Sequence, residues 1–212
     1  EPLCLDVKNA FYHHDDAPLI VGGRYALGGK DVLPNDIAAV FDNLNKPLPM
    51  DGFTLGIVDD VTFTSLPPRQ QTLAVSHDGI TACKFWGMGS DGTVGANKSA
   101  IKIIGDKTPL YAQAYFSYDS KKSGGITVSH LRFGDRPINS PYLIHRADFI
   151  SCSQQSYVER YDLLDGLKPG GTFLLNCSWS DAELEQHLPV SFKRYLAREN
   201  IHFYTLNACL LY

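Results

Sequence analysis

Apolar residues along the chain alternate with polar ones in some segments and recur every three to four positions in others. The first pattern is typical of strands and the second of helices with one buried side. Strands are predicted at 53–57, 82–86, 110–118, 125–133, 147–152, 172–175 and 201–206. Helices are predicted at 35–44, 93–104, 156–164 and 181–199, the last broken at Pro189. This alternation predicts an α/β fold, with a Rossmann-like, largely parallel sheet, helices on both faces and a smaller α/β piece in front.

The apolar positions also predict which helix faces are buried and where helices end. Helix 35–44 is expected to bury the face that carries its apolar residues, Ile37, Val40, Phe41 and Leu44. Helix 93–104 has Val94, Ala100, Ile101 and Ile104 as its apolar residues and is expected to end at Gly105. Helix 156–164 is expected to stop before the turn-forming segment 168–171.

Two proline-rich segments, 46–52 and 66–71, interrupt the pattern. Proline continues neither a helix nor a central strand, so both segments mark boundaries. We therefore expect one domain piece at 1–68, a linker at 69–81 and a larger domain at 82–212.

The 212 residues are 44% hydrophobic and 20% charged, with a formal net charge of −4. That composition is typical of a globular protein and excludes disordered or collagen-like chains. Nucleic-acid binding is not expected, because it needs a basic face. No apolar run approaches the roughly 20 residues of a membrane helix, so no membrane partner is expected. The start, Glu1-Pro2-Leu3, has neither a basic segment nor an initiator Met, so we expect no signal peptide and a processed chain or a piece of a longer one.

Five cysteines are widely spaced, at positions 4, 83, 152, 177 and 209. None forms a Cys-x-x-Cys pair, so we expect no metal site in this chain. Most lie in apolar surroundings, which favours buried free thiols over disulfides. The run His13-His14-Asp15-Asp16 is interpreted as a solvated turn, and Asp59-Asp60 as a capping or turn pair rather than a cation site.

The segment richest in chemistry lies between predicted strand 82–86 and predicted helix 93–104. It reads Gly87-Met88-Gly89-Ser90-Asp91-Gly92-Thr93-Val94-Gly95-Ala96-Asn97-Lys98. Its Gly-x-Gly-x-x-Gly spacing permits a tight turn and a close approach of a diphosphate to the backbone. The start of the helix offers unpaired N–H groups to an anion. Asn97 can add a directional hydrogen-bond donor, and Lys98 can add a positive point charge. The alternative is a turn that needs glycine only for packing, and the strand–helix context favours phosphate binding.

The segment after predicted strand 110–118 bears on which phosphate ligand fits. In an NAD site, an acidic residue about 20 residues beyond the glycines binds the ribose, and Asp119 could fill that role. Lys121, Lys122 and Ser123 follow it and suit an additional phosphate, so coenzyme A or NADP outranks NAD. A solvated turn is an equal alternative for the two lysines.

Polar residues also follow predicted strand 172–175, where doubly wound folds place ligand contacts. Asn176 and Ser178 are the candidates there. The sequence shows no Ser-His-Asp constellation, no Cys-His pair and no Gly-Asp-Gly signature of a magnesium thiamine diphosphate site. No catalytic residue is therefore predicted in this segment.

Basic residues gather on predicted strand 125–133 and just beyond it. His130 and Arg132 fall on one face of the strand, and Arg136 follows. An anion-facing or interface role and a structural salt-bridge role are equally open for them.

Taken together, these segments resemble the pyruvate:ferredoxin (flavodoxin) oxidoreductases. The resemblance covers nearly the whole chain and rests on residues 1–7, 22–25, 53–62, 87–98, 102–105, 118–125, 129–134 and 168–176. It implies that the chain is an internal slice of a longer enzyme. Residues 1–68 would be the C-terminal part of a transketolase-C-like domain, and residues 82–212 most of a gamma-type domain.

The resemblance also implies a chemistry. The family cleaves a 2-oxo acid with thiamine diphosphate and Mg²⁺, passes electrons through [4Fe–4S] clusters to ferredoxin or flavodoxin, and transfers the acyl group to coenzyme A. The gamma-type domain is the part implicated in holding coenzyme A. Residues that the motif would place at its diphosphate or ADP end are Ser90, Asp91, Gly92, Thr93, Val94, Asn97 and Lys98. Weaker candidates nearby are Lys121, Lys122, Ser123, Asn176 and Ser178.

The thiamine and cluster sites of that family lie outside this chain, so the chain alone is expected to be inactive. Its expected partners are the other domains of the same enzyme, the electron acceptor and a second copy in a homodimer. The expected location is the cytoplasm, or a hydrogenosome if the source is a protist. Two other functions stay open: a non-catalytic interaction domain like that of some sulfite reductase flavoprotein subunits, and a free-standing NAD(P)-binding oxidoreductase domain.

Overall fold

The computed structural model describes residues 2–59, 61–69, 73, 75, 78–118 and 124–210. It divides into two compact units, Glu1–Val75 and Ser76–Tyr212, each of which is described by itself. The division lies within the stretch 69–81, and the assignment of the two sides to named domains stays a prediction. In the described ranges, no helix combines the length and the apolar composition that a membrane crossing requires.

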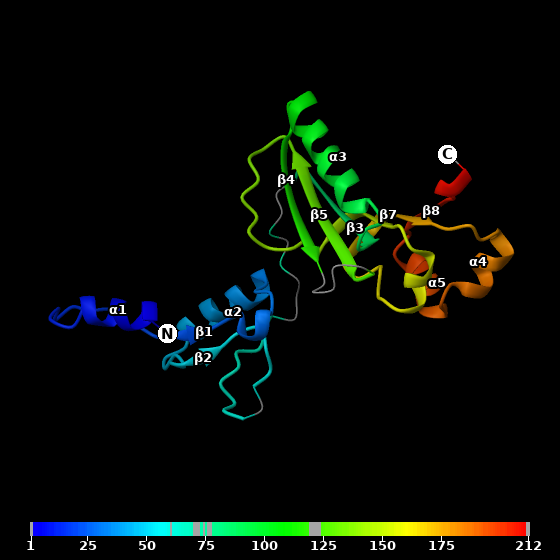
Figure 1. The fold of residues 1–212 in the computed structure, drawn as a ribbon. Helices are drawn as coiled ribbons and strands as arrows, with labels where there is room; N and C mark the ends of the chain where they lie inside the picture. Colours follow the sequence, from blue (N-terminus) through cyan, green and yellow to red (C-terminus); the bar gives the residue numbers. More distant parts are fainter. Residues whose placement is uncertain are drawn as a thin grey trace. The chain divides into compact units, whose positions relative to one another are not determined.

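The first unit is small and holds two short parallel strands, β1 (Gly23–Arg24) and β2 (Phe53–Thr54) (Figure 1). The predicted strand 53–57 is therefore too long, because the chain turns at Gly56, whose φ is +76°. Helices α1 (Pro2–Ala10) and α2 (Pro34–Leu44) and the 3₁₀ turn η1 (Leu27–Gly29) complete the unit. Its core is a cluster of Ala39, Phe53, Leu55 and Leu66.

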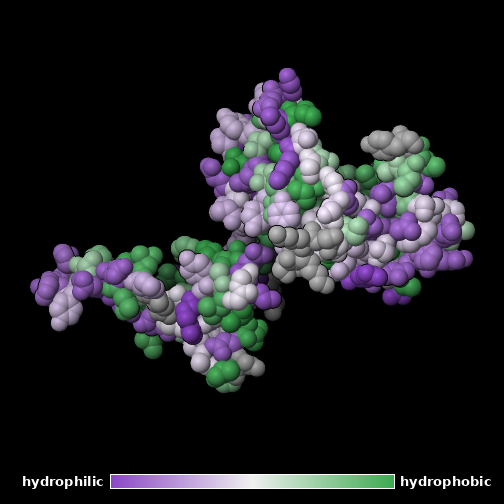
Figure 2. Space-filling view, viewed as in Figure 1, coloured by the Kyte–Doolittle hydropathy of each residue, from purple (hydrophilic) through white to green (hydrophobic). Residues whose placement is uncertain are grey.

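The predicted buried face of α2 is wrong for three of its four residues. Ile37, Phe41 and Leu44 are exposed, and Figure 2 shows apolar side chains at the surface of this unit. Polar side chains set the orientation instead. Asn43 exchanges two hydrogen bonds with the backbone of Met50, at 2.9 and 3.0 Å, and Asp36 accepts one from the Leu33 amide at 2.9 Å. These bonds turn the face that carries Ala38 and Ala39 inward.

The second unit contains a six-stranded sheet in the order β4-β5-β3-β6-β7-β8 (Figure 1). All strands but β5 run in one direction, which confirms the predicted α/β class with a largely parallel sheet. The bounds of the strands are β3 Ile80–Met88, β4 Tyr111–Tyr118, β5 Ile126–Gly134, β6 Ala147–Cys152, β7 Leu167–Asn176 and β8 His202–Leu206.

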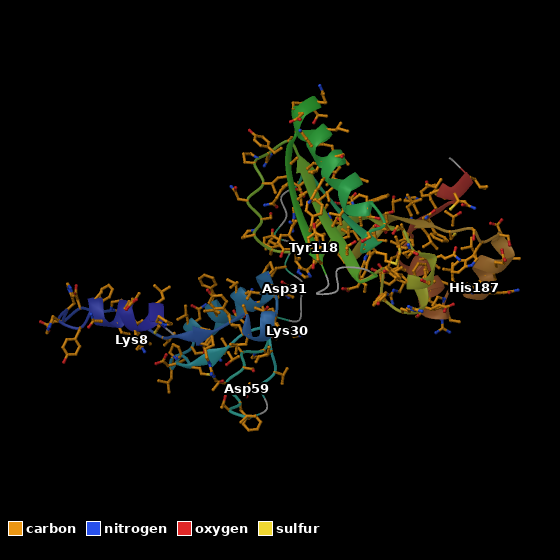
Figure 3. All side chains as sticks on the ribbon, in the orientation of Figure 1. Lys8, Lys30, Asp31, Asp59, Tyr118 and His187 are labelled. Atoms are coloured by element: carbon orange, nitrogen blue, oxygen red, sulfur yellow. The ribbon has the colours of Figure 1, made fainter. Side chains whose placement is uncertain are left out.

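Strand β5 is antiparallel because the connection that precedes it is short. β4 ends at Tyr118 (Figure 3) and β5 begins at Ile126, too few residues for the crossover that a parallel partner needs. β5 then inserts between β4 and β3 and pairs with both. The end of β4, the start of β5 and the end of β3 consequently meet at one edge of the sheet.

The helices of this unit cover both sheet faces, as predicted. α3 (Thr93–Lys107) packs on β3, β4 and β5. The break at Pro189 is confirmed: α4 (Asp181–His187) and α5 (Val190–Arg198) replace one long helix. On the opposite face, Phe192 of α5 packs against Phe173 and Phe203 at ring-centroid distances of 5.4 and 6.3 Å.

Three predicted boundaries of the second unit are wrong. Gly105 lies inside α3, because the chain keeps helical hydrogen bonds up to the Thr108 amide. Only the 3₁₀ turn η2 (Gln155–Glu159) forms where helix 156–164 was predicted. Segment 168–171 belongs to β7, which accommodates it through a register shift beside Ala147 and Phe149.

The core of this unit lies under α5 and the segment after η2. Its most buried side chains are Ile150, Leu163, Leu164, Phe173, Leu175 and Cys152. All five cysteines are free, and Cys83, Cys152 and Cys177 are buried while Cys209 is exposed. Burial raises the pKa of the Cys83 and Cys152 thiols to about 12.

Candidate functional site

The predicted glycine-rich segment forms a tight turn between β3 and α3. Ser90 and Gly92 both take left-handed backbone conformations, with φ of +75° and +85°. Glycine adopts this geometry freely, whereas serine is strained in it. The Gly89 amide donates a hydrogen bond to the Gly125 carbonyl at 2.7 Å, which fixes the turn against the start of β5.

Asp91 organises this turn through its carboxylate. It accepts hydrogen bonds from the Met88 amide at 2.7 Å, the Thr93 amide at 2.8 Å and the Ser153 hydroxyl at 2.8 Å. Partial burial acts to raise the pKa of Asp91, but these hydrogen bonds outweigh it and hold the pKa below its usual value. The charged carboxylate is thus turned into the loop, and its effect on a ligand would be indirect.

The N-terminus of α3 leaves several backbone donors available. Among the residues that the structure describes, the amides of Gly92, Val94 and Gly95 have no hydrogen-bond partner. A Cβ placed on Gly92 or Gly95 would meet nothing within 4 Å, so the space beside both is open. Free amides at the positive end of a helix attract anions, and phosphate is the common biological example.

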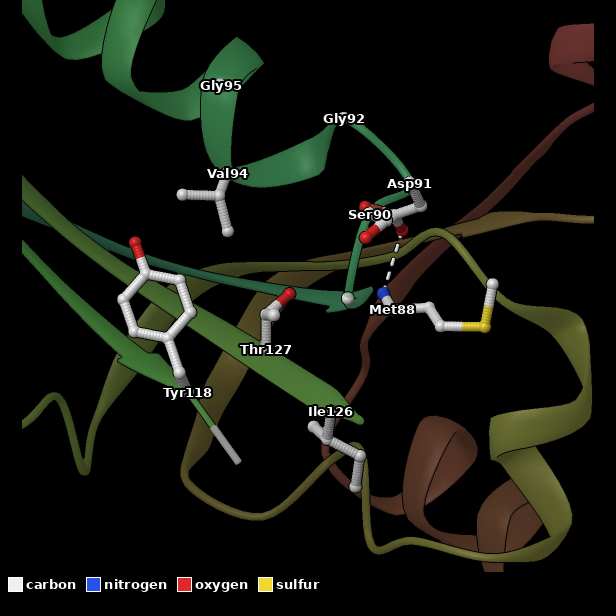
Figure 4. A pocket seen from close by; sticks show the side chains of 10 residues that line it. Met88, Ser90, Asp91, Gly92, Val94, Gly95, Tyr118, Ile126 and Thr127 are labelled. Carbon is white, nitrogen blue, oxygen red and sulfur yellow. Dashed lines mark hydrogen bonds between the residues drawn. The ribbon is translucent and has the colours of Figure 1, made fainter. Parts of the chain in front are cut away.

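A cavity of about 550 Å³ adjoins these amides (Figure 4). It is lined by Met88, Gly89, Ser90, Asp91, Gly92, Val94, Gly95, Tyr118, Ile126 and Thr127. The loop and the start of α3 form one side of it, and the end of β4 and the start of β5 form the other. Its volume lies within the range of roughly 300–1,000 Å³ that small-molecule sites occupy.

Gly87 shapes the deep side of this region. A Cβ at Gly87 would lie 2.7 Å from Thr93 Cβ, 2.8 Å from Thr93 Oγ1 and 2.9 Å from Thr127 Oγ1. Real Cβ atoms do not approach other atoms so closely, so only glycine lets the two hydroxyls lie over the strand.

Five of the predicted contact residues line the cavity: Gly89, Ser90, Asp91, Gly92 and Val94. Thr93 and Gly87 lie directly beside it. Asn97 lies one turn deeper, 5% exposed beneath α3, and its Nδ2 has no hydrogen-bond partner in the described part of the chain. Lys98 is exposed, with Nζ 5.3 Å from the centroid of the Phe116 ring, and does not line the cavity.

The other predicted candidates are not brought to the cavity. Asn176 donates to the Ser153 carbonyl at 3.1 Å and accepts from the Ala208 amide at 3.0 Å, so it joins the ends of strands. Ser178 binds the Gln155 side chain through its amide at 3.0 Å. The predicted residues Lys121, Lys122 and Ser123, like Asp119, lie outside the described residues.

Sequence reasoning missed half of the cavity lining. The missed residues are Met88, Gly95, Tyr118, Ile126 and Thr127. Met88 and Gly95 lay inside the glycine-rich segment itself. The other three flank the connection between β4 and β5, and only the pairing of β5 with β3 places them opposite the loop.

The basic residues of β5 lie on the opposite sheet face and fasten neighbouring loops. Arg132 donates to the Tyr142 carbonyl at 2.8 Å, and the neighbouring Lys84 donates to the Asp165 carbonyl at 2.6 Å. His130 accepts from the Ile144 amide at 3.2 Å. Arg132 also donates to the Gln113 side chain at 3.4 Å. Within the described ranges neither His130 nor Arg132 forms an ion pair with a carboxylate, and Arg136 is exposed.

Burial controls the protonation of these groups. It lowers the pKa of His130 to about 3, assisted by the positive charges of Lys84 and Arg132 and by His145. Burial also lowers the pKa of Lys84, while Asp165 and Asp162 oppose that shift. His130 is therefore neutral at physiological pH, which suits its role as an acceptor.

The acidic pair at positions 59 and 60 was predicted to form a turn. Asp59 lies in the loop after β2, and hydrogen bonds from Thr62 lower its pKa to about 2, in keeping with the predicted turn role. Its neighbour, residue 60, lies outside the described residues. Across 2–59, 61–69, 73, 75, 78–118 and 124–210, no three His, Cys, Asp or Glu side chains converge on a point that could hold a metal ion.

Residues 82–210 match the family described as "Pyruvate ferredoxin/flavodoxin oxidoreductase". Over 208 residues the chain is 99% identical to "Pyruvate-flavodoxin oxidoreductase" of Klebsiella pneumoniae and 55% identical to "Pyruvate:ferredoxin oxidoreductase" of Moorella thermoacetica, with 98% of this chain covered in both cases. It spans 18% of the length of each of these relatives. A crystal structure of a pyruvate oxidoreductase subunit from Thermotoga maritima shows a distant likeness, with a TM-score of 0.43, 15% identity, and 52% of this chain and 57% of that chain covered.

Proposed function

The chain belongs to the pyruvate ferredoxin/flavodoxin oxidoreductase family, and from this premise we propose that it holds coenzyme A and supplies scaffold within such an enzyme. In the proposed reaction the enzyme decarboxylates pyruvate oxidatively, passes electrons to ferredoxin or flavodoxin and forms acetyl-coenzyme A. The chain's part is to bind and orient the nucleotide end of coenzyme A. The gamma-type domain named for 82–212 and the transketolase-C-like piece named for 1–68 belong to this proposal.

One observation carries the proposal: the open N-terminus of α3 faces a cavity large enough for part of a nucleotide. Among the described residues, no group accepts a hydrogen bond from the amides of Gly92, Val94 and Gly95, so all three can donate to a ligand. Donors of this kind fit a diphosphate, whose oxygens only accept. Tyr118, half exposed at the end of β4, offers an aromatic face near the same cavity.

The lysines extend this proposal to the additional phosphate of coenzyme A. Lys98 is exposed one turn beyond Val94, and its side chain is long enough to move from Phe116 toward a ligand at the helix start. Lys121, Lys122 and Ser123 come three to five positions after Tyr118 in sequence and keep their proposed role toward the additional phosphate. Asn176 supports the loop through Ser153, which bonds Asp91, and this gives Asn176 a positioning role. Ser178 bonds Gln155 of η2 and stays a weaker candidate.

The topology counts against an NAD(P) domain. In a dinucleotide-binding fold the second parallel strand lies beside the first, and the acidic residue at its end reaches the ribose. Here β5 separates β4 from β3, so the end of β4 is one strand further away. That displacement leaves room for a bulkier ligand between the glycine loop and Tyr118.

Thiamine diphosphate, Mg²⁺ and [4Fe–4S] clusters are assigned in this proposal to other parts of the longer enzyme. Clusters need several thiolates together, whereas the cysteines here lie on separate elements. Cys83 lies on β3, Cys152 ends β6, Cys177 follows β7 and Cys209 lies in the C-terminal 3₁₀ turn. Other domains of the same enzyme, an electron-accepting ferredoxin or flavodoxin and a second copy in a homodimer are the proposed partners.

Calorimetric titration of a full-length oxidoreductase that carries this sequence tests the proposal. Coenzyme A should bind, NAD and NADP should not compete, and dephospho-coenzyme A should bind more weakly because it lacks the phosphate assigned to the lysines. Equal binding of dephospho-coenzyme A would remove the role of the lysines. The assigned site would be contradicted if Lys98→Ala and changes at the α3 N-terminus had no effect on coenzyme A binding while substitutions elsewhere abolished it.

A further inference from the structure

Thr127 is a buried threonine whose hydroxyl has no hydrogen-bond partner among the residues that the structure describes. It is only 5% exposed, yet it lines the cavity. Buried polar groups in native proteins nearly always have a partner, so an unpaired hydroxyl at a cavity points to something that binds there. Thr127 lies outside the glycine-rich segment, so that motif does not explain why its hydroxyl is unpaired.

The sheet aims this hydroxyl at the loop. Thr127 pairs with Gly87 on one side and with Tyr118 on the other, so all three share a sheet face. Gly87 has no side chain to cover the neighbouring hydroxyl. Figure 4 shows the Thr127 hydroxyl on the side that faces the loop, between the Tyr118 ring and Met88.

The surrounding groups define what Thr127 can bind. The Asp91 carboxylate is turned toward other donors, the Met88 and Thr93 amides and the Ser153 hydroxyl, and it accepts nothing from Thr127. On the other side of the cavity, the free amides of Gly92 and Gly95 are donors only. A group with acceptor oxygens alone fits between donors on both sides, and a phosphate is such a group.

Building on the proposed function, we propose that Thr127 is a specificity residue for the phosphate moiety of the ligand. Its hydroxyl donates a hydrogen bond to a phosphate oxygen from the sheet side, opposite the α3 amides. Coenzyme A therefore binds through its diphosphate at this point, with a side chain from β5 selecting it in addition to the glycine loop.

The test compares three variants in the full-length oxidoreductase by calorimetric titration with coenzyme A. Thr127→Val removes only the hydroxyl and should weaken binding about 10-fold or more, as loss of a hydrogen bond to a charged group does. Thr127→Ser keeps the hydroxyl and should bind within about threefold of the unsubstituted enzyme by the same reasoning. Thr205→Val, at an exposed threonine of β8, is the matched control and should bind as the unsubstituted enzyme does.

Two further readouts separate binding from folding. Because valine removes an unpaired buried hydroxyl, Thr127→Val should not lower the unfolding temperature. Pantetheine, which lacks the nucleotide and its phosphates, should bind the Thr127→Val and unsubstituted enzymes equally.

Unchanged coenzyme A binding by Thr127→Val would overturn the inference alone and leave the proposed function standing. An equal loss of pantetheine binding would also overturn it, because the hydroxyl would then contact another part of the ligand. Absence of coenzyme A binding by the unsubstituted enzyme would overturn the inference together with the proposed function.

Discussion

The Ser153 hydroxyl donates a hydrogen bond to the Asp91 carboxylate, with 2.8 Å between Oγ and Oδ2. This bond ties the end of β6 to the turn that follows β3, although the two residues are 62 positions apart in sequence. The Ser153 carbonyl in turn accepts from Asn176 at the end of β7. These hydrogen bonds thus link the ends of the neighbouring strands β3, β6 and β7 and hold the turn beside the cavity.

Replacing Ser153 by Ala should loosen this turn. The Asp91 carboxylate loses one of three donors, so its pKa should rise, and the ordered geometry of the amides should weaken. A lost hydrogen bond to a charged group is worth about 1.5–3 kcal/mol, so coenzyme A should bind at least about 10-fold more weakly by titration if the turn loses that support. Ser156→Ala, at an exposed serine of η2, is the control and should have no effect. Equal binding by both variants would show that the bond does not position the turn.

His130 should make the stability of β5 depend on pH. Its pKa is about 3 when folded and about 6.5 as a free side chain, so the unfolded chain binds more protons between these values. The stabilisation is complete above about pH 6.5 and falls as the pH drops toward 3, by up to about 1.4 kcal/mol per pH unit.

Hydrogen–deuterium exchange of peptides from β5, corrected for intrinsic rates, measures this effect in the full-length protein. Protection should fall between pH 7.5 and pH 5. His130→Asn keeps an acceptor for the Ile144 amide but no group that titrates in this range, so its protection should fall less. The same pH dependence in both proteins would assign the effect to other groups.

The buried thiols should resist alkylation in the folded protein. With their pKa raised to about 12, Cys83 and Cys152 carry almost no thiolate at pH 8 and are also shielded from reagent. Mass spectrometry after iodoacetamide treatment should find both unmodified, and both modified once the protein is denatured first. Rapid native labelling of either cysteine would contradict the burial of β3 and β6.

Much of the second unit could be predicted from sequence because strand ends and turns carry local signals. β6 was predicted to the residue, and Pro189 marked the break between α4 and α5. The direction of β5 and its place between β4 and β3 carry no local signal, since they depend on pairing between distant segments. Likewise, apolar periodicity did not predict that Asn43 and Asp36 would be turned inward in α2.

At the site, too, the features set by neighbouring residues could be predicted, and those set by distant segments could not. The glycine pattern identified the turn and the helix start, because these depend on neighbouring residues. It did not identify Tyr118 and Thr127, which the hairpin of β4 and β5 brings opposite the turn. Asn176 seemed suited to a ligand by its place after a strand, but both its side-chain groups bind backbone of the same unit.

The central claim is that the glycines at the start of α3 leave room for a ligand rather than merely bending the chain. Gly95 and Gly105 lie in the same helix, and alanine is favoured over glycine inside a helix by about 0.5–1 kcal/mol. A Cβ on Gly95 would enter open space beside the cavity, whereas one on Gly105 would make an ordinary contact with Ala112 Cβ at 3.8 Å. Neither substitution should lower the unfolding temperature.

The most direct measurement is therefore the affinity of full-length Gly95→Ala and Gly105→Ala enzymes for coenzyme A. Gly95→Ala should bind at least about 10-fold more weakly, because its methyl group crowds the free amides, and Gly105→Ala should bind as the unsubstituted enzyme does. If Gly95→Ala binds coenzyme A as tightly as Gly105→Ala, the turn serves the backbone alone and the proposed site is wrong.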